Sequence, residues 1–336
     1  MHDVREWFER RSYDYTQFAD PIALADRKRE LGLSVSVLLP CLRVTPEVRT
    51  LINEIHALNE RAPLTDQIAV IAASSSHGMD AACPDAEVYS GDELMPEYGP
   101  VVGKGDAMWR ALSIARGDLV GYADVEAPAF EPHFVRGVLR LLLSLPRLRF
   151  AKAAYEGPSR DAQAEAEVEV ALAELMVRPL LNLHYPKLSG FSQPLSAPFA
   201  APRELFCSIP FFTGNTPEMT ITIDLLHKVG LDATAQVNFG SRRGSRRFLT
   251  NPGCESYAML RAVDLRLGRG SSGRPPSEEA HSWAHGTPAT VDSYTPPVAS
   301  SEGVWFRKYT AEIAERPPIM RVLQDLQEPC KLTADD

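Results

Sequence analysis

A lysine and two carboxylates stand out because of the short motifs that carry them. Lys104 lies in the glycine-bracketed motif G-K-G-D, and Asp124 and Glu126 end the motif L-V-G-Y-A-D-V-E. A lysine can stabilise phosphate oxygens, and paired carboxylates are hard ligands of the kind that divalent cations prefer. These residue types and their spacing predict a site for a diphosphate, its counter-charge and a divalent cation.

Each of these residues needs a secondary-structure element to position it. Apolar residues recur at helical spacing after Lys104, so a helix is expected to begin in the glycine loop and to stop at Gly117. Residues 119–122 are short and apolar, which predicts a buried strand. Open α/β sheets bind ligands at the carboxyl ends of their strands, where Asp124 and Glu126 would then lie.

The surrounding chain alternates between strand and helix patterns. Residues 33–39 form a β-branched, apolar run closed by Pro40, and residues 68–73 predict a second strand. Between them Thr45 is expected to cap a helix that has Pro46 at its first position. This alternation predicts βαβ units and therefore an α/β fold with a Rossmann-like, doubly wound, mainly parallel sheet.

The ends of the chain differ from this pattern. Residues 1–32 are expected to form an N-terminal helical arm that could cover a dimer partner, so we expect a homodimer. Residues 251–336 are expected to form a helical C-terminal extension, with short helices over 304–313 and 319–326. Within it, residues 268–303 are rich in Gly, Pro and Ser and poor in apolar side chains, which predicts a long flexible loop.

Composition limits the classes of partner. The 336 residues carry a formal net charge of −9, which disfavours sequence-blind binding to nucleic acid because that needs a basic surface. No apolar run is long enough to span a bilayer, so no membrane partner is expected. The five cysteines are odd in number and have no C-x-x-C spacing, which indicates neither a disulfide framework nor a zinc site. A cytoplasmic protein is expected.

Several motifs follow one another in a fixed order between about residues 35 and 247. They are L-P-C-L, G-K-G-D-A-M-W-R-A-L, R-G-D-L-V-G-Y-A-D-V-E, R-P-L-L, Q-P-L-S, A-A-P-R-E-L, P-E-M-T-I-T-I-D and G-L-D-A-T-A-Q-V-N-F-G. Their order and spacing resemble the glucosyl-3-phosphoglycerate synthases and their mannosyl relatives, which are nucleotide-sugar glycosyltransferases of A-type fold. The resemblance implies that residues 33–250 form the glycosyltransferase domain. Its part 33–130 would bind the nucleotide sugar, and its part 131–250 would form the acceptor side.

The resemblance also implies residue roles. Lys104 and Asp124 would act at the diphosphate, Glu218 would hold the sugar hydroxyls, and all three are expected to be catalytic. The implied metal is Mg²⁺ or Mn²⁺, with Glu126 as its expected ligand and Asp124 as a second candidate. The expected donor-binding residues are Pro40, Cys41, Leu42, Ser74, Lys104, Asp124, Val125, Glu126, Leu195, Arg242 and Arg243.

Departures from the family pattern leave the metal open. The family has Asp where this chain has Glu126, and its metal-binding His falls at Gly244. The arginine-rich residues 242–247 bring four guanidinium groups to the same place. Guanidinium groups bind phosphate in a forked geometry and need no metal to do so. A bound ion, arginines in its place and a merely solvated basic loop are therefore alternatives.

Other departures concern the two substrates. Val44 and Ala72 replace acidic residues that the family places near the base. These replacements leave the base open, so guanine and therefore a GDP-sugar donor are allowed. The family's phosphoglycerate loop corresponds to residues 168–171 and Ala173, where a Glu stands in place of an Arg. These changes resemble the S-glycosyltransferases of lincosamide antibiotic biosynthesis, which join a GDP-activated octose to the thiol of ergothioneine. The alternatives are a glucosyl- or mannosyl-3-phosphoglycerate synthase and an inactive homologue that acts in binding or assembly.

Overall fold

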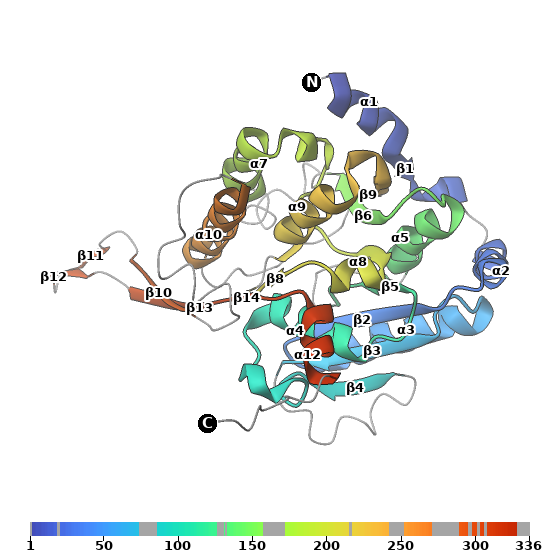
Figure 1. Cartoon of the computed structure of the whole chain (residues 1–336), viewed down its shortest axis with the longest axis horizontal. Helices are drawn as coiled ribbons and strands as arrows, with labels where there is room; N and C mark the ends of the chain where they lie inside the picture. Colours follow the sequence, from blue (N-terminus) through green and yellow to red (C-terminus); the bar gives the residue numbers. More distant parts are fainter. Residues whose placement is uncertain are drawn as a thin grey trace, which may run out of the picture.

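An eight-stranded sheet forms the centre of the computed structural model (Figure 1). The structure describes residues 2–18, 21–73, 86–125, 131, 133–156, 172–214, 217–241, 252–270, 289–294, 298–300, 303–305 and 308–327. The strand order is β1-β9-β6-β7-β5-β2-β3-β4. The bounds are β1 Ser12–Asp14, β2 Val35–Cys41, β3 Gln67–Ala72, β4 Glu87–Ser90, β5 Leu119–Tyr122, β6 Phe150–Glu156, β7 Phe199–Pro202 and β9 Thr234–Ser241.

Most neighbouring strands of this sheet are parallel. β2 pairs in parallel with β3 and β5, β3 with β4, and β9 with both β6 and β1. Only β7 is antiparallel, to β5 and to β6. The predicted Rossmann-like, mainly parallel α/β fold is confirmed. Residues 199–202 form β7, and helix α8 begins directly after it at Arg203.

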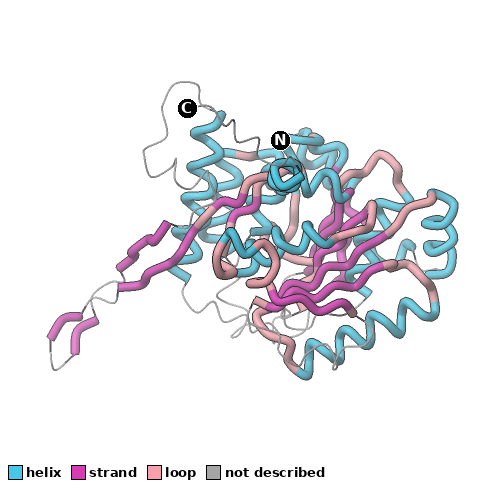
Figure 2. Tube along the Cα trace, turned by 60° about the horizontal axis from the view of Figure 1, so that its bottom comes forward, coloured by secondary structure: helices cyan, strands magenta, loops and turns pink. Residues whose placement is uncertain are grey.

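Helices cover both faces of the sheet (Figure 2). In β2, Leu38 packs into one hydrophobic cluster with residues of α4, whereas Val37 and Leu39 pack into a second cluster with residues of α3 and α5. Strands that are buried on both faces do not alternate regularly between apolar and polar residues, and the mostly apolar sequence of β2 fits this rule. The helices are α1 His2–Arg11, α2 Pro21–Leu31, α3 Pro46–Arg61, α4 Gly103–Ile114, α5 His133–Ser144, α7 Arg178–His184, α8 Arg203–Cys207, α9 Pro217–Val229, α10 Pro252–Gly270 and α12 Ile319–Gln327. Within the described part of the chain, none of them has the length and apolar content needed to cross a bilayer.

Short helical turns join these elements. Among the described residues, these turns are η1 Tyr15–Phe18, η3 Pro96–Tyr98, the π-helical η5 Ala173–Val177, η6 Pro186–Gly190 and η7 Leu231–Ala233. The predicted cap of α3 is confirmed, because the side chain of Thr45 accepts a hydrogen bond from Val48 N at 3.4 Å.

The N-terminal arm becomes the edge of the sheet. Helix α1 anchors it through Trp7, whose Nε1 donates to Leu231 O at 3.0 Å and to Thr234 O at 3.2 Å. The indole lies against Phe191, with ring centroids 4.7 Å apart. A Cβ atom on Gly190 would come within 2.7 Å of the same indole, so glycine makes room for it. The arm therefore packs on its own chain through a buried tryptophan.

The C-terminal part contains strands where helix and loop were expected. The helix expected over residues 304–313 is wrong, since β12 Gly303–Trp305 and β13 Lys308–Ile313 occupy this range. They pair with β11 Val298–Ser300 and β10 Ala289–Tyr294, which lie inside the range expected to be loop. Aromatic and β-branched residues favour the pleated pairing. Figure 2 shows the β10–β13 ribbon projecting from the body. The predicted last helix is present as α12.

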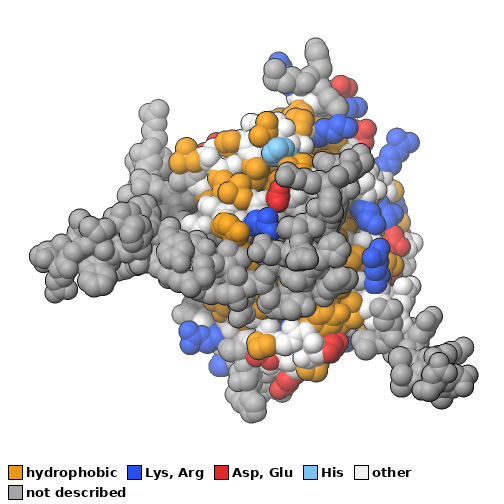
Figure 3. Space-filling model, turned by 60° about the vertical axis from the view of Figure 1, so that its left-hand side comes forward, with side chains coloured by type: hydrophobic (Ala, Val, Ile, Leu, Met, Phe, Trp, Pro, Cys, Tyr) orange, Lys and Arg blue, Asp and Glu red, His pale blue; other side chains and the backbone are white. Residues whose placement is uncertain are grey.

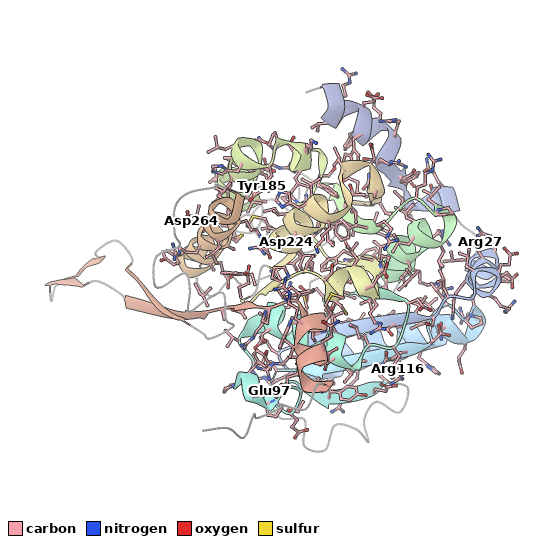
Figure 4. All side chains as sticks on the ribbon, viewed as in Figure 1. Arg27, Glu97, Arg116, Tyr185, Asp224 and Asp264 are labelled. Carbon is pink, nitrogen blue, oxygen red and sulfur yellow. The ribbon has the colours of Figure 1, made fainter. Side chains whose placement is uncertain are left out.

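Ion pairs and exposed leucines characterise the side of the molecule that carries α7 and α10. Asp224 on α9 faces α10, as Figure 4 shows, and Arg266 Nε donates to its Oδ1 at 3.0 Å.

Three leucines, Leu175 on η5, Leu183 on α7 and Leu260 on α10, have exposed side chains. Figure 3, which brings this side forward, shows apolar side chains gathered on its upper part. Exposed apolar patches commonly mark interfaces, but the expected homodimer stays a prediction.

Candidate active site

The side chain of Lys104 lies between two carboxylates that come from distant parts of the chain. Its Nζ atom is 3.0 Å from Asp124 Oδ2 and also donates a hydrogen bond to Glu218 Oε1. Lys104 lies in the first turn of α4, Asp124 follows β5, and Glu218 lies in the first turn of α9. The exposed fractions of the three side chains are only 9%, 4% and 1%. The structure thus brings together the three residues that the sequence predicts to be catalytic.

Glycines allow the starts of α4 and α9 to approach each other. Gly105 N donates to Gly214 O at 2.8 Å, and Gly214 N donates to Val102 O at 3.0 Å. A Cβ atom on Gly105 would lie 2.1 Å from Phe212 O, and Gly103 has a φ of +73° that only glycine adopts readily. The predicted glycine loop therefore serves a close backbone contact, and this contact places Lys104 beside Glu218.

The described residues of the site carry more negative than positive charge. One ammonium faces two buried carboxylates, and Glu218 Oε2 accepts no hydrogen bond from any residue that the structure describes. A buried carboxylate oxygen without a donor is costly, because it has lost its water and gained nothing in return. A ligand hydroxyl group or a cation would supply the missing partner. The geometry suits a sugar hydroxyl close to a phosphate.

The residues predicted on the nucleotide side lie at the same edge of the sheet. Ala123 N donates to Leu38 O at 3.2 Å, so the end of β2 lies beside the residues that follow β5. Pro40 and Cys41 are buried at this end of β2, whereas Leu42 directly after them is 60% exposed. An exposed apolar side chain at a strand end is available to pack against a flat base. Val125 is buried next to Asp124.

Leu195 is also buried, in the hydrophobic cluster that contains α4 and α9. The loop around it is held from β6, where Lys152 Nζ donates to Ser196 O and Tyr155 Oη donates to Ala197 O at 2.9 Å. This loop is therefore fixed to the sheet between the nucleotide side and the acceptor side. The structure gives Leu195 no polar role.

Several predicted site residues lie outside the described residues. These are Ser74, Glu126, Arg242, Arg243 and Gly244, together with the acceptor-loop positions 168–171. Among the described residues, no group of three or more His, Cys, Asp or Glu could hold a metal ion. The described carboxylate at the expected metal position is Asp124, whose oxygens are hard ligands that fit Mg²⁺ or Mn²⁺.

A buried charge network behind Lys104 has no counterpart among the predicted residues. Asp106 accepts hydrogen bonds from Arg316 Nε at 2.7 Å, from Arg316 Nη2 at 2.8 Å and from Arg110 Nη2 at 3.2 Å. All three residues are fully buried. Arg110 also donates to Leu94 O at 2.8 Å and to Gly99 O at 2.6 Å. The network therefore ties α4 to the loop before it and to the C-terminal part of the chain.

We call residues 313–317 the strap, because they contact both α4 and the segment that leads to α9. In the strap, Ala314 N donates to Thr213 Oγ1 at 2.8 Å, and Ala314 O accepts from Thr213 N at 2.9 Å. β14 Glu315–Arg316 pairs with β8 Phe211–Phe212, directly before the loop to α9. Trp109 Nε1 on α4 donates to Pro317 O at 2.7 Å. The strap thus fixes α4, which carries Lys104, and residues 211–213, which precede α9 and its Glu218.

Comparison with known proteins places the chain in one group of enzymes. No protein-family model matches it. Glucosyl-3-phosphoglycerate synthase of Petrotoga mobilis is 32% identical over 265 residues, which cover 77% of this chain and 81% of the relative. The enzyme of the same description from Mycolicibacterium smegmatis is 31% identical over 86% of this chain and 89% of its own.

Solved structures give the same result. The crystal structure of mannosyl-3-phosphoglycerate synthase from Rubrobacter xylanophilus is 47% identical, with a TM-score of 0.79 over 95% of this chain and 98% of that one. Glucosyl-3-phosphoglycerate synthase from Mycobacterium tuberculosis, in complex with Mn²⁺ and UDP-glucose, is 28% identical, with a TM-score of 0.71 over 90% of this chain and 95% of that one. The chain belongs to the glucosyl- and mannosyl-3-phosphoglycerate synthase family of A-type glycosyltransferases.

Proposed function

We propose that this glycosyltransferase moves a sugar from a nucleoside diphosphate to a small acceptor at the site around Lys104. The observation that carries the proposal is the ion-paired lysine between Asp124 and Glu218 at the carboxyl edge of the sheet. The acceptor oxygen or sulfur forms a bond to the anomeric carbon and loses its proton, while the bond between that carbon and the diphosphate breaks and the leaving diphosphate takes the electron pair. Lys104 neutralises that developing charge, and Glu218 holds the sugar hydroxyls through its second oxygen.

We propose that a divalent cation assists at the diphosphate. Asp124, with Glu126 two residues further on, supplies the hard oxygen ligands that Mg²⁺ or Mn²⁺ prefers. Support comes from the tuberculosis relative, whose structure contains Mn²⁺ together with UDP-glucose. The ion would stabilise negative charge on the phosphate oxygens when bound. Gly244, in place of the family's histidine, removes one ligand of the usual set.

Metal removal has a defined expected result. EDTA should abolish turnover, and Mg²⁺ or Mn²⁺ in excess should restore it, because Lys104 by itself leaves most of the diphosphate charge uncompensated. The measurement is the release of nucleoside diphosphate from the sugar donor. If EDTA reduces turnover only modestly, and Arg242→Ala or Arg243→Ala weakens nucleoside diphosphate binding by about 1.5–3 kcal/mol, the arginines replace the ion.

The relatives favour 3-phosphoglycerate as the acceptor and a UDP-sugar as the donor. The acceptor is supported by the two glucosyl-3-phosphoglycerate synthases, by the mannosyl enzyme of Rubrobacter and by the enzyme of Mycobacterium tuberculosis. The donor is supported by the structure of the last enzyme, which contains UDP-glucose. Because the mannosyl enzyme is 47% identical to this chain, the transferred sugar could be mannose as well as glucose. Synthesis of glucosyl- or mannosyl-3-phosphoglycerate is therefore the first candidate reaction.

A second candidate is transfer from a GDP-sugar to the thiol of ergothioneine. The observation that favours it concerns the acceptor side. Ala173 is buried at the start of η5, and its methyl group offers no donor for a phosphate. The segment 157–171 just before it contains one Arg and four acidic residues. A multiply charged phosphoglycerate is bound best by a surplus of cationic side chains, which this segment does not provide.

One experiment separates the candidates. UDP-glucose, GDP-mannose and GDP-glucose are each combined with 3-phosphoglycerate or with ergothioneine, and products are identified by mass spectrometry. Transfer to phosphoglycerate alone supports the first candidate, and transfer to the thiol alone supports the second. Binding of nucleoside diphosphates without hydrolysis or transfer to either acceptor would leave only the inactive homologue. Absence of any nucleotide binding would overturn the proposed function.

A further inference from the structure

A second cavity lies on the face of the sheet opposite to α4. It has a volume of about 620 Å³ and lies between η1, α2, α3, α5 and the end of β9. Helices α3 and α5 pack on the sheet face opposite to the hydrophobic cluster of α4 and α9. The cavity therefore is separate from the site around Lys104. Its size is in the range of small-molecule sites.

Three arginines and one histidine lie among the described residues that line this cavity, and the other lining residues are mostly apolar. Arg61 comes from α3, and His133, Arg136 and Arg140 come from α5, whereas none of the described lining residues is acidic. This is notable in a chain with a net charge of −9. Arg136 and Arg140 are four residues apart on one helix, where like charges repel. Burial, and then the charge of Arg140, lower the pKa of Arg136.

Backbone contacts fix the central guanidinium of the cavity. Arg136 Nη1 donates to Leu58 O at 2.8 Å, and Arg136 Nη2 donates to Ala62 O at 3.2 Å. These bonds use two of the five N–H groups of the side chain and set its orientation. The remaining N–H groups can meet an acceptor without further ordering of the side chain. Arg136 is therefore a preorganised donor.

Aromatic rings form one wall of the cavity. The rings of Tyr15 and Phe239 are stacked with centroids 5.9 Å apart, and His133 lies 5.9 Å from Tyr15 and 6.0 Å from Phe239. A Cβ atom on Gly137 would lie 2.4 Å from the ring of Phe239, so glycine lets this ring approach α5. Burial lowers the pKa of His133, against a weaker opposite effect of the Glu131 carboxylate, which lies 3.3 Å from its Nδ1 atom. The wall reduces water around the half-buried Arg136 and Arg140, which strengthens their interaction with an anion.

We propose that this cavity binds a small molecule carrying one or more phosphate groups. Three guanidinium groups around one space suit a multiply charged anion better than a single carboxylate, because each fork can bind two phosphate oxygens. The bound anion offsets the repulsion between Arg136 and Arg140. It also joins α3 to α5, since Arg61 and Arg136 come from different helices.

Pyrophosphate binding, measured by calorimetry, tests the proposal. Lys104→Met is the background for the measurement, because the donor site is also expected to bind pyrophosphate. In this background the cavity should still bind pyrophosphate, and the added pair Arg61→Gln and Arg140→Gln should weaken binding about tenfold or more. The matched pair Arg10→Gln and Arg321→Gln removes the same charge from exposed positions outside the cavity and should leave binding unchanged.

Two results would overturn the proposal. One is the loss of all pyrophosphate binding in Lys104→Met alone. The other is equal weakening by the cavity pair and by the matched pair, which would indicate only a general charge effect. If the cavity pair does not fold, Arg61→Glu gives the same test, because this side chain is exposed and makes no described hydrogen bond. Unchanged binding in Arg61→Glu would also contradict the proposal.

Discussion

Lys104→Met should lower kcat about 100-fold or more while the protein stays folded. The ammonium group is the described cation at the proposed diphosphate position, and a preorganised charge of this kind contributes about 2.7–4 kcal/mol to the transition state. The side chain is also the partner of two buried carboxylates, so Glu218 and Asp124 would lose their orientation. Turnover of the sugar donor and the affinity for nucleoside diphosphate measure the effect.

Two further variants make this result specific. Lys104→Arg keeps the charge and should retain more activity than Lys104→Met if charge is what matters. Lys228→Met removes an exposed lysine from α9, the helix that also carries Glu218, and should leave kcat unchanged. Wild-type turnover in Lys104→Met would place the transfer reaction somewhere other than this site.

Arg316→Met should destabilise the protein by about 1.5–3 kcal/mol, because buried Asp106 loses its hydrogen bonds from Arg316 and keeps those from Arg110 and Val102 N. Arg316 makes two short hydrogen bonds to Asp106, and its guanidinium lies 5.2 Å from the ring of Tyr98 and 5.7 Å from that of Trp109. Methionine fills part of the space but gives Asp106 no donor. Chemical denaturation followed by tryptophan fluorescence measures the loss.

The control is Arg321→Met, which changes an exposed arginine on α12 five residues further along the chain. Its stability should stay within about 0.5 kcal/mol of the wild type, as for most surface substitutions. A loss below about 1 kcal/mol in Arg316→Met would mean that water or another group replaces the guanidinium beside Asp106. The strap would then contribute little to the position of α4.

Local patterns were sufficient to predict the elements that carry Lys104 and Asp124. The two residues are separated by one helix and one strand, and each of these has a clear apolar pattern. Glu218 is 114 positions away from Lys104, so its place beside the lysine came from family resemblance and not from periodicity. Sequence patterns predict the helices and strands within one βαβ unit, but they do not predict which distant residues come into contact.

Long-range contacts explain what sequence reasoning missed. Asp106 and Arg316 are 210 positions apart, and neither has a local signal beyond a charged residue in or near a helix. β1 is only three residues long and is defined by its pairing with β9. In β7, two alanines favour helix by propensity, but pairing with β5 and β6 prevails. Contacts with distant parts of the chain therefore determine that these segments are strands and that Asp106 pairs with Arg316.

The position of the strap near the end of the chain has a consequence for biosynthesis. Ribosomes deliver the N-terminal part first, so β2, β5 and α4 can assemble long before residues 313–317 emerge. Until then Asp106 lacks Arg316, and Thr213 lacks its backbone partner in the strap. A nascent chain that does not yet contain the strap already holds every proposed donor-side residue, but its α4 lacks the hydrogen bonds of Asp106 with Arg316 and of Trp109 with Pro317. We therefore expect the donor site to be less rigid in the growing chain until residues 313–317 have emerged.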